Sequence, residues 1–344
     1  MAFSWRNRHQ DFNSQLAGKE VSLFKLENKA GMSCYITNYG SRIVSLYVAD
    51  RDMNFVDVVL GYDTLKEYLK DEHYFGALVG RFANRISNAS FELDGQVFHI
   101  NKNSGDNHIH GGSVGFSNVV WDVLETDSSH LKMGYLSADG EQGYPGNVQV
   151  HVDYRLSEEN ELVIKYEGRT DKATPISLTD HSYYNLQGAG NGTVDGHIVR
   201  ICSDYYAVVD DNGIPTGEIR SVENDGYDQR IAKPLSSRSR VDYDINYALR
   251  EDGMKLAAEI YEPKTGRKLS LYTSAAGLQF YNACHLNSQT KGKNGMFYSS
   301  RSGFCLEPQC FPDSPNRPEF PSSVLRPGAV YRSENRYVFT VDQI

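Results

Sequence analysis

The sequence predicts an all-β protein, folded as a large antiparallel β-sandwich with few short helices. Three observations support this prediction. Apolar and polar residues alternate along many short segments, turn-forming residues separate these segments, and one short segment alone shows helical spacing. Strands of this kind must hide their edges and apolar faces in a barrel or in two packed sheets. A sandwich fits a chain of 344 residues.

In chain order, three strands and one short helix come first. The strands are expected at residues 21–26, 32–37 and 43–49. The helix is expected to begin at Asp63, because an aspartate side chain can cap the free backbone N–H groups of a first turn. Leu65, Tyr68 and Leu69 then lie on one side of that turn.

Two hairpins are expected next. In FELDGQVFHI, residues 91–100, Asp94-Gly95 forms the bend, since glycine readily adopts the positive φ that a tight hairpin needs. In VQVHVDYRL, residues 148–156, apolar residues occupy every second position, and the alternation resumes at residues 162–166 after a turn. Further strands are expected at residues 197–202, 268–273, 278–283 and 336–341.

No feature of the sequence divides the chain. It contains no linker rich in proline and serine, no repeat of fixed period and no low-complexity tract, so residues 1–344 are expected to form a single domain. Residues 284–323 are rich in glycine and proline and are expected to be ordered loops. Loops of this kind often carry functional sites.

Composition excludes several partners. The net charge is −9, from 44 acidic and 35 basic residues, and no long basic run is present. Neither nucleic acid nor an anionic membrane is therefore an expected partner. The nearest approach to a basic patch is Arg238-Ser-Arg240, which is expected to be a solvated surface loop.

The cysteines and the N-terminus predict a cytoplasmic protein. Five cysteines, an odd number without a CxxC pair, are most simply free thiols. MAFSWRNRHQDF at the N-terminus lacks the apolar core of a signal peptide, and the chain nowhere has eighteen consecutive apolar residues. GAGNGT at residues 188–193 lacks the last glycine of a dinucleotide-binding motif and is expected to be a turn.

His108 and His110 form the first candidate site. Their spacing places two imidazoles on the same side of a strand, which could begin a metal site, although the sequence specifies no third ligand. An apolar core position is not expected for either histidine beside Asn107 and Gly111-Gly112. A polar surface turn, a metal ligand and a ligand-binding loop remain open as interpretations.

His181 and Glu307 form the second candidate site. His181 lies among tyrosines in TDHSYYNL, and Glu307 lies between apolar residues and a proline in GFCLEPQ. A carboxylate in such a setting needs either satisfying partners or a function. Arg85 and Asp244 are also charged residues with apolar neighbours in the sequence. Taken singly, each of the four has an ordinary structural interpretation.

Taken together and in order, a set of motifs resembles the aldose 1-epimerase (galactose mutarotase) family over nearly the whole chain. The motifs are GRFANRI at 80–86, NHIHGG at 107–112, WDV at 121–123, GYPG at 143–146, TDHSYYNL at 179–186, GLQFYNA at 277–283, KGKNG at 291–295, SGFCLEPQ at 302–309 and FPDSPNRPEFP at 311–321. The resemblance implies a β-sandwich of the galactose mutarotase type. It also implies an isomerase that interconverts the α and β anomers of free aldohexoses, such as galactose and glucose, without a cofactor or a metal.

The resemblance also implies roles for nine residues. Glu307 corresponds to the general base and His181 to the general acid, which suits a reaction that deprotonates the C1 hydroxyl and protonates the ring oxygen. Tyr281 resembles the aromatic wall of the sugar site. The implied contacts to sugar hydroxyls, or supports of the catalytic pair, are Asn84, Arg85, His110, Tyr183, Asp244 and Gln279.

The chain departs from the family pattern at two places. Where relatives have Gly-Tyr-Asp-His, it has Asp242-Tyr-Asp244-Ile, so either Asp242 or Asp244 could be the sugar-binding carboxylate. Asp244 is preferred because Asn246-Tyr247 follows at the expected distance. His108 stands where relatives often have a smaller or uncharged residue, and it is assigned no role.

Other functions are weighed against this one. A hexose-6-phosphate 1-epimerase would need a cluster of arginines, which the sequence does not place, and a non-catalytic carbohydrate-binding relative would not need both Glu307 and His181. The expected partner is a small sugar, and the expected state is a monomer or weak homodimer. An enzyme of this kind that works at neutral pH needs the pKa of His181 raised, and nearby carboxylates are expected to raise it.

Overall fold

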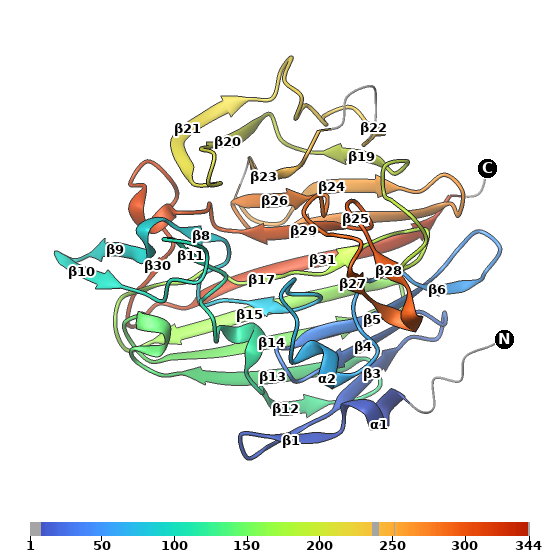
Figure 1. The fold of residues 1–344 in the computed structure, drawn as a ribbon, viewed down its shortest axis with the longest axis horizontal. Coiled ribbons are helices and arrows are strands. Elements are labelled where there is room, and N and C mark those ends of the chain that lie inside the picture. Colours follow the sequence, from blue (N-terminus) through green and yellow to red (C-terminus); the bar gives the residue numbers. More distant parts are fainter. Residues whose placement is uncertain (1–7, 236–240, 251, 343–344) are drawn as a thin grey trace.

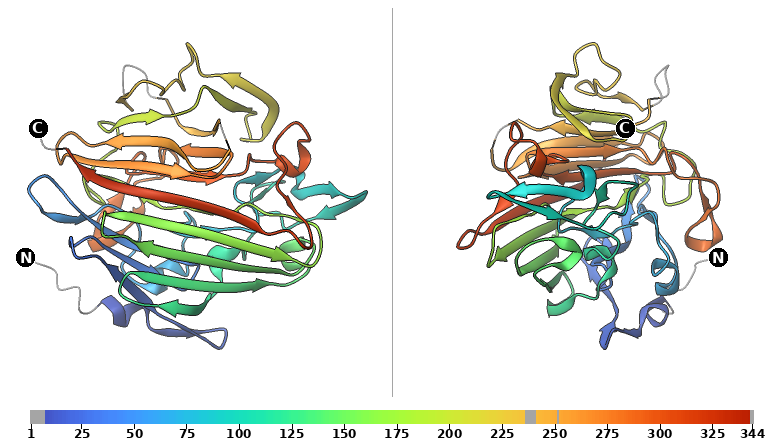
Figure 2. Two further views of the ribbon diagram at one scale, coloured as in Figure 1. Left: turned by 180° about the vertical axis from the view of Figure 1, so that it is seen from behind. Right: turned by 60° about the vertical axis from the view of Figure 1, so that its left-hand side comes forward.

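The computed structural model describes residues 8–235, 241–250 and 252–342. Two packed layers form a sandwich, with a nine-stranded sheet at the back and sheets of six and four strands in front (Figures 1 and 2). The long strands pair antiparallel, so the predicted all-β sandwich is confirmed. The cluster Arg238-Ser-Arg240 and residues 1–7 lie outside the described residues.

The nine-stranded sheet is seen face-on in the left view of Figure 2. Its strands, in spatial order, are β12 (Asp122–Thr126), β13 (His130–Ser137), β14 (Val148–Leu156), β15 (Glu161–Thr170), β31 (Tyr331–Val341), β25 (Arg267–Thr273), β24 (Lys255–Tyr261), β19 (Ile198–Ile201) and β22 (Lys233–Pro234). Its longest pairing brings β14 against β15, and the next longest bring β13 against β14 and β15 against β31. These strands supply a broad apolar face toward the front layer.

The front layer carries most of the polar residues singled out in the sequence. Its six-stranded sheet runs β18 (Tyr183–Tyr184), β29 (Phe304–Gln309), β26 (Gly277–Tyr281), β23 (Asp244–Ala248), β20 (Tyr205–Val209) and β21 (Pro215–Ser221). Its four-stranded sheet runs β3 (Leu23–Glu27), β4 (Ser33–Thr37), β5 (Arg42–Ala49) and β6 (Phe55–Asp57).

Short strand pairs and two short helices complete the described fold. The pairs are β1 (Ser14–Leu16) with β2 (Lys19–Val21), β7 (Leu78–Val79) with β17 (Thr179–Asp180), β8 (Arg85–Ile86) with β11 (His108–Ile109), β9 (Ser90–Leu93) with β10 (Gln96–His99), β16 (Thr174–Pro175) with β30 (Val324–Leu325), and β27 (Thr290–Lys291) with β28 (Phe297–Tyr298). The helices are α1 (Arg8–Phe12) and α2 (Leu65–Tyr68). No helix among the described residues is both long and apolar enough to span a membrane.

Alternation along the strands fills the core as predicted. Val148, Val150, Val152 and Tyr154 are fully buried, and they pack with residues of the front sheets such as Phe280 in one continuous cluster. The apolar positions of a strand recur every second residue, so one face of β14 is dry and the other is solvated. Each fully buried side chain of this size contributes about 1.5–3 kcal/mol to folding.

Both predicted hairpins are present. The β14 and β15 strands pair in register from Leu156 and Leu162 outward. In the β9–β10 hairpin, Leu93 pairs with Gln96, and both intervening residues, Asp94-Gly95, have positive φ. This geometry is typical of a two-residue type I′ turn.

Two predictions of local structure are wrong. The N-cap of α2 is Thr64, not Asp63, because Glu67 reaches back to the backbone N–H of Thr64 and completes a capping box. Leu69 follows the helix and is exposed. The segment 284–323 is not made of loops alone, since it contains β29, which is buried along its whole length. A strand buried on both faces shows no alternation, which conceals it in the sequence.

β17 carries a buried carboxyl group that the sequence analysis did not single out. The Asp180 side chain accepts hydrogen bonds from the hydroxyl and the backbone N–H of Ser182, at 3.0 and 3.4 Å. No lysine, arginine or histidine in the described part of the chain forms an ion pair with it. Burial therefore raises the pKa of Asp180 to about 7.

Replacing Asp180 by asparagine should stabilise the fold at alkaline pH. Because the folded state binds the Asp180 proton more tightly than the unfolded state, the contribution of Asp180 to stability is full below pH 4. It is lost as the pH rises through 7. The free energy of unfolding of Asp180→Asn should exceed that of the wild type by about 2–4 kcal/mol at pH 8, and by much less at pH 4–5. Urea denaturation at both pH values measures this.

The exposed Asp211→Asn, at a carboxylate outside the ion pairs of the described residues, provides the matched control and should not change the pH dependence of unfolding. A loss of stability in Asp180→Asn that is equal at both pH values would show that the carboxylate form is the one the fold requires.

Candidate active site

A pocket of about 220 Å³ lies over the outer face of the six-stranded sheet. Strand alternation builds its floor. Leu306 points into the core between the layers, so its neighbour Glu307 points to the opposite face. Gln279 pairs with Glu307 across β26 and β29, while Asp244 on β23 pairs with Tyr281 on β26. Three adjacent strands thus place their polar and aromatic side chains on one surface.

The opposite wall of the pocket comes from the motifs GRFANRI (80–86) and NHIHGG (107–112), which form hydrogen bonds with each other. The backbone N–H of Asn84 donates to His110 Nδ1 at 3.2 Å, and the carbonyl of Asn84 accepts from the N–H of His110 at 3.2 Å. Gly111 has φ +85°, and a Cβ atom there would lie 1.7 Å from the carbonyl oxygen of Gly80. A residue with a side chain could not sit at this contact.

The hydrogen bond at Nδ1 fixes the tautomer of His110. A backbone N–H can only donate, so Nδ1 accepts and the proton of the neutral ring is on Nε2. Burial and the neighbours His181 and Arg85 hold the pKa of His110 well below its ordinary value. His110 is therefore a neutral donor at the pocket.

His181 and Glu307 face each other at the base of the pocket. Nε2 of His181 lies 3.6 Å from Oε2 of Glu307, and both side chains are almost completely buried. Oε2 of Glu307 has no hydrogen-bond partner among the described residues, and neither has Oε1 of Gln279. Buried polar atoms without protein partners at a pocket can form hydrogen bonds with a polar ligand.

The pKa values of the pair move in opposite directions. Burial lowers the pKa of His181 to about 4, while the carboxylates of Asp71 and Asp244 oppose this shift only in part. Burial, then Asp244 and Asp180, raise the pKa of Glu307 well above its ordinary value. The expectation that nearby carboxylates raise the pKa of His181 is wrong, because desolvation of the ring outweighs them.

An ion pair lies beside His181 and Glu307. Arg85 lies 3.5 Å from Asp244, and Nε2 of Gln279 donates to Asp244 at 2.6 Å. Arg85 and Asp244 remain partly exposed to the pocket. Their guanidinium and carboxylate groups can therefore offer both donors and acceptors to a hydroxylated ligand.

Most residues carried over from the family resemblance meet at this pocket. Those that line it are Asn84, Arg85, His110, His181, Tyr183, Asp244, Tyr281 and Glu307. Gln279 stands behind them as a partner of Asp244. Asp242 lies elsewhere, with 68% of its side chain exposed and an ion pair to Arg301, so Asp244 is the carboxylate at the pocket.

His108 and His110 do not share a face. His110 has φ +53°, which ends the strand at Ile109 and turns the two imidazoles apart. His108 is fully buried, with Nδ1 bonded to the carbonyl of Asn101 at 2.6 Å and Nε2 to the hydroxyl of Tyr144 at 2.7 Å. None of the three interpretations left open, a polar surface turn, a metal ligand or a ligand-binding loop, applies to His108, because it is buried and both ring nitrogens have protein partners.

Several pocket residues were missed in the sequence: Glu72, His73, Tyr74, Ile109 and His285. None of them lies in a periodic segment. Ile109 ends β11, and the loops that carry the other four meet only in the folded chain. His73 of one loop bonds Thr290 of the other at 3.1 Å. This hydrogen bond joins residues 217 positions apart, so no local pattern in the sequence predicts it.

Two of the recognised motifs have structural roles. Arg81 is buried and donates to the carbonyls of Pro145 and Gly146 at 2.8 and 2.9 Å, which joins GRFANRI to GYPG. Lys293, in KGKNG, donates to Asp57 at 2.7 Å and to the carbonyl of Val59 at 2.6 Å. Buried cations satisfied in this way anchor loops.

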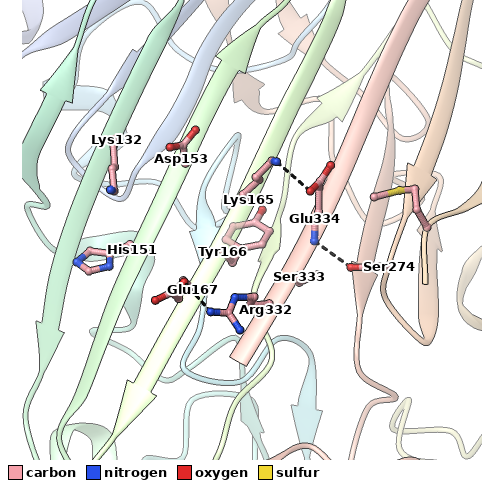
Figure 3. A pocket seen from close by; sticks show the side chains of 11 residues that line it. Lys132, His151, Asp153, Lys165, Tyr166, Glu167, Ser274, Arg332, Ser333 and Glu334 are labelled. Carbon is pink, nitrogen blue, oxygen red and sulfur yellow. Dashed lines mark hydrogen bonds and ion pairs between the residues drawn. The ribbon is translucent and has the colours of Figure 1, made fainter. Parts of the chain in front are cut away.

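A larger hollow, of about 610 Å³, lies on the solvent side of the nine-stranded sheet (Figure 3). Four of its charged side chains pair with each other across neighbouring strands, Lys165 with Glu334 at 3.1 Å and Arg332 with Glu167 at 3.5 Å (Figure 3), and Lys132 and Asp153 pair with residues beside the hollow. These side chains occupy the solvent-facing positions of strands in which inward and outward residues alternate. Because its charges are already paired, this hollow is a weaker candidate than the smaller pocket.

The geometry agrees with comparisons to known proteins. The sequence profile of a family described as aldose 1-epimerase matches residues 22–338. The chain belongs to this family. Galactose mutarotase of Rattus norvegicus is 40% identical over 329 residues, 94% of this chain and 95% of that protein. Aldose 1-epimerase of Escherichia coli K12 is 33% identical over 94% of this chain and 97% of its own.

Solved structures extend the comparison. The GalM/aldose epimerase homologue from C. elegans has a TM-score of 0.89 and 30% identity, over 94% of this chain and 100% of that chain. Galactose 1-epimerase from Lactobacillus acidophilus has a TM-score of 0.83 and 26% identity, over 96% and 97%. The resemblance to the aldose 1-epimerase family that the motifs indicate is thus confirmed.

The pocket of this family member also contains residue types that bind metals. His110, His181 and Glu307 each offer a ligand atom, and these atoms lie within 4.8 Å of one another. The Asn84 N–H, however, already uses the lone pair of His110 Nδ1, and Nε2 carries the ring proton. A metal would have to remove that proton or break the backbone hydrogen bond.

Metal analysis should therefore find no tightly held zinc or iron. After dialysis against EDTA, the purified protein is expected to contain far less than one equivalent of either metal and to keep its circular dichroism spectrum. One equivalent of zinc that disappears in His181→Asn would contradict this prediction and identify the three residues as ligands.

Proposed function

We propose that this protein is an aldose 1-epimerase that interconverts the α and β anomers of free aldohexoses, with galactose and glucose as the natural candidates. The observation that carries the proposal is the buried pair of His181 and Glu307, 3.6 Å apart at a pocket of about 220 Å³ that is rich in hydrogen-bonding groups. Membership of the aldose 1-epimerase family supports it, as do the relatives named galactose mutarotase.

The reaction needs one proton acceptor and one proton donor. Opening the hemiacetal ring removes the proton of the C1 hydroxyl and adds a proton to the ring oxygen, and the C1–ring oxygen bond breaks. The resulting aldehyde rotates about its C1–C2 bond. Ring closure then attacks the other face of C1, and both protons return. Glu307 is the proposed base and His181 the proposed acid in the opening step.

Burial suits this exchange because the pair holds a single proton. With the pKa of Glu307 raised and that of His181 lowered, the proton rests on Glu307 in the empty pocket. Arg85 opposes the rise in the pKa of Glu307, so a sugar that reorganises the charges beside Arg85 can help move the proton to His181. The two sites titrate as a unit.

The remaining residues are proposed to orient the sugar. Arg85, Asp244 and neutral His110 offer hydrogen bonds to sugar hydroxyls, and Gln279 holds Asp244 in place. The ring of Tyr281, only 9% exposed, provides an apolar wall for the sugar's C–H groups. Orientation of this kind supplies rate enhancement beyond the proton transfers themselves.

A phosphorylated sugar is a less suitable substrate. Arg85 is the one arginine among the residues that line the pocket, no lysine lines it, and Asp244 already pairs with Arg85. A phosphate group usually requires several cationic or backbone donors. A binding function without catalysis would not need the buried acid–base pair of His181 and Glu307.

The proposed location of the protein is the cytoplasm, and its proposed oligomeric state is a monomer or weak homodimer. The five cysteines are all free, and Cys34 and Cys305 are buried, which supports a reducing compartment. Size-exclusion chromatography with light scattering measures the oligomeric state.

Removing either member of the pair should abolish most of the activity. In polarimetric assays of freshly dissolved α-galactose and α-glucose, Glu307→Gln and His181→Asn are each expected to lower kcat by about 10²–10⁴-fold, since each loses one general acid–base group. Two buried residues outside the pocket provide matched controls, Glu262→Gln and His197→Asn, which should keep the wild-type kcat. Near-native turnover in either pocket variant would disprove the assigned roles.

The pH profile should be a broad bell. The active form holds one proton on the pair. The acidic limb therefore reports a second proton binding to His181, near pH 4, and the alkaline limb reports loss of the shared proton, whose pKa at Glu307 is raised. The value of kcat/KM is expected to be nearly constant above about pH 5, until the pH approaches the raised pKa of Glu307. A narrow optimum below pH 6 would instead indicate ordinary pKa values for both groups.

A further inference from the structure

Two tyrosine rings stack on the imidazole of His181. Tyr74 lies 5.8 Å from it between ring centroids and Tyr183 lies 5.1 Å from it, each at an interplanar angle of 25°. Tyr74 also meets the ring of His110 edge-on, at 4.8 Å. Tyr74 therefore contacts both histidines of the pocket, although no motif in the sequence contains it.

A buried ion pair pins the turn that carries Tyr74. Asp71 accepts hydrogen bonds from the backbone N–H groups of His73 and Phe75, both at 3.0 Å, and pairs with buried Arg42 at 2.5 Å. Tyr74, between them, has φ +58°. A bulky residue seldom adopts this left-handed conformation, and strain of this kind persists only where the surroundings enforce it.

The same turn is bonded directly to the backbone of His181. The N–H of His181 donates to the carbonyl of Ala77 at 2.8 Å, and its carbonyl accepts from the N–H of Gly76 at 3.2 Å. The N–H of Ala77 in turn donates to the carbonyl of Tyr74 at 3.0 Å. The position of the Tyr74 ring relative to the imidazole is thus fixed by short backbone connections.

Protonated His181 needs stabilisation that water cannot supply in this buried pocket. The ionisable groups around it are Glu307 and Cys305 on β29, His110 after β11, Asp244 on β23, Tyr183 on β18, Tyr74 and Asp71 in the turn, and Arg42 on β5. Arg42 and Asp71 act on the charge of His181 in opposite directions. Glu307 becomes protonated itself when His181 gives up its proton. The faces of aromatic rings, by contrast, attract a cation and cannot take its proton.

We propose that Tyr74 is a positioning residue, whose ring face, with that of Tyr183, fixes the imidazole plane of His181 and stabilises its protonated form during ring opening. This inference rests on the proposed epimerase function. The ring, and not the hydroxyl, carries the effect. A phenylalanine at position 74 should therefore replace tyrosine, and an aliphatic residue should not.

The experiment compares Tyr74→Phe with Tyr74→Leu. Leucine keeps the site apolar but has no ring face. Tyr74→Leu should lower kcat about ten-fold with little change in KM, the effect expected for loss of one desolvated cation–π contact. Its acidic limb should move to lower pH by up to about one unit, because the imidazolium is less stable. Tyr74→Phe should match the wild type in both measurements.

Tyr35→Leu is the matched control, because it removes a buried tyrosine ring that packs on Tyr47, away from His181. It should keep the wild-type kcat and pH profile. Equal losses in Tyr74→Phe and Tyr74→Leu, or an acidic limb that moves to higher pH in Tyr74→Leu, would overturn the inference. Should leucine prevent folding, Tyr74→Met offers an unbranched replacement with the same expected outcome.

Failure of the proposed function can be told apart from failure of this inference. If the wild-type protein had no activity on any aldose, the proposed epimerase function would be refuted. The inference is then decided by NMR titration of the His181 imidazole in folded protein, where Tyr74→Leu must titrate at lower pH than Tyr74→Phe. Identical titrations would refute the role of the ring.

Discussion

Burial of an acid–base pair without a strong counter-cation is the constraint on which the rest of this site depends. Glu307 and His181 are enclosed together, and desolvation drives both toward their neutral forms. A single proton shared within the pair avoids a net buried charge. Both positions of that proton, on Glu307 or on His181, leave the pair without net charge, although the raised pKa of Glu307 favours the first. The proposed reaction uses both positions, because ring opening and ring closure move the proton in opposite directions.

The sheet and the loops contribute differently to this arrangement. The floor depends on strand alternation, since Glu307, Gln279 and Asp244 project from three adjacent strands whose other residues fill the core. The wall depends on backbone contacts between loops, as at Gly80 and Gly111, where no side chain fits. The floor is thus rigid because the sandwich is well packed, and the wall is rigid because its loops are bonded to one another.

The sequence predicts the elements that obey a simple period and misses those that do not. The β14–β15 hairpin follows from alternation, whereas β29, which carries Glu307, is buried on both faces, contains Pro308 and resembles a loop in sequence. The family motifs lead to the residues at the pocket, and Asp244 rather than Asp242 then follows from the fold. The pKa of His181 could not be predicted, because it depends on burial by Tyr74 and other residues distant in sequence.

The rim of the pocket is built from parts that the acid–base pair does not need. Glu72 and His285 are exposed, and the loops that carry them meet through His73 and Thr290. Substitutions there alter the entrance while the strands below keep their register. Natural selection or a designer could therefore change which ligands enter the pocket by exchanging short rim segments, while His181 and Glu307, the proposed proton-transfer groups, keep their positions.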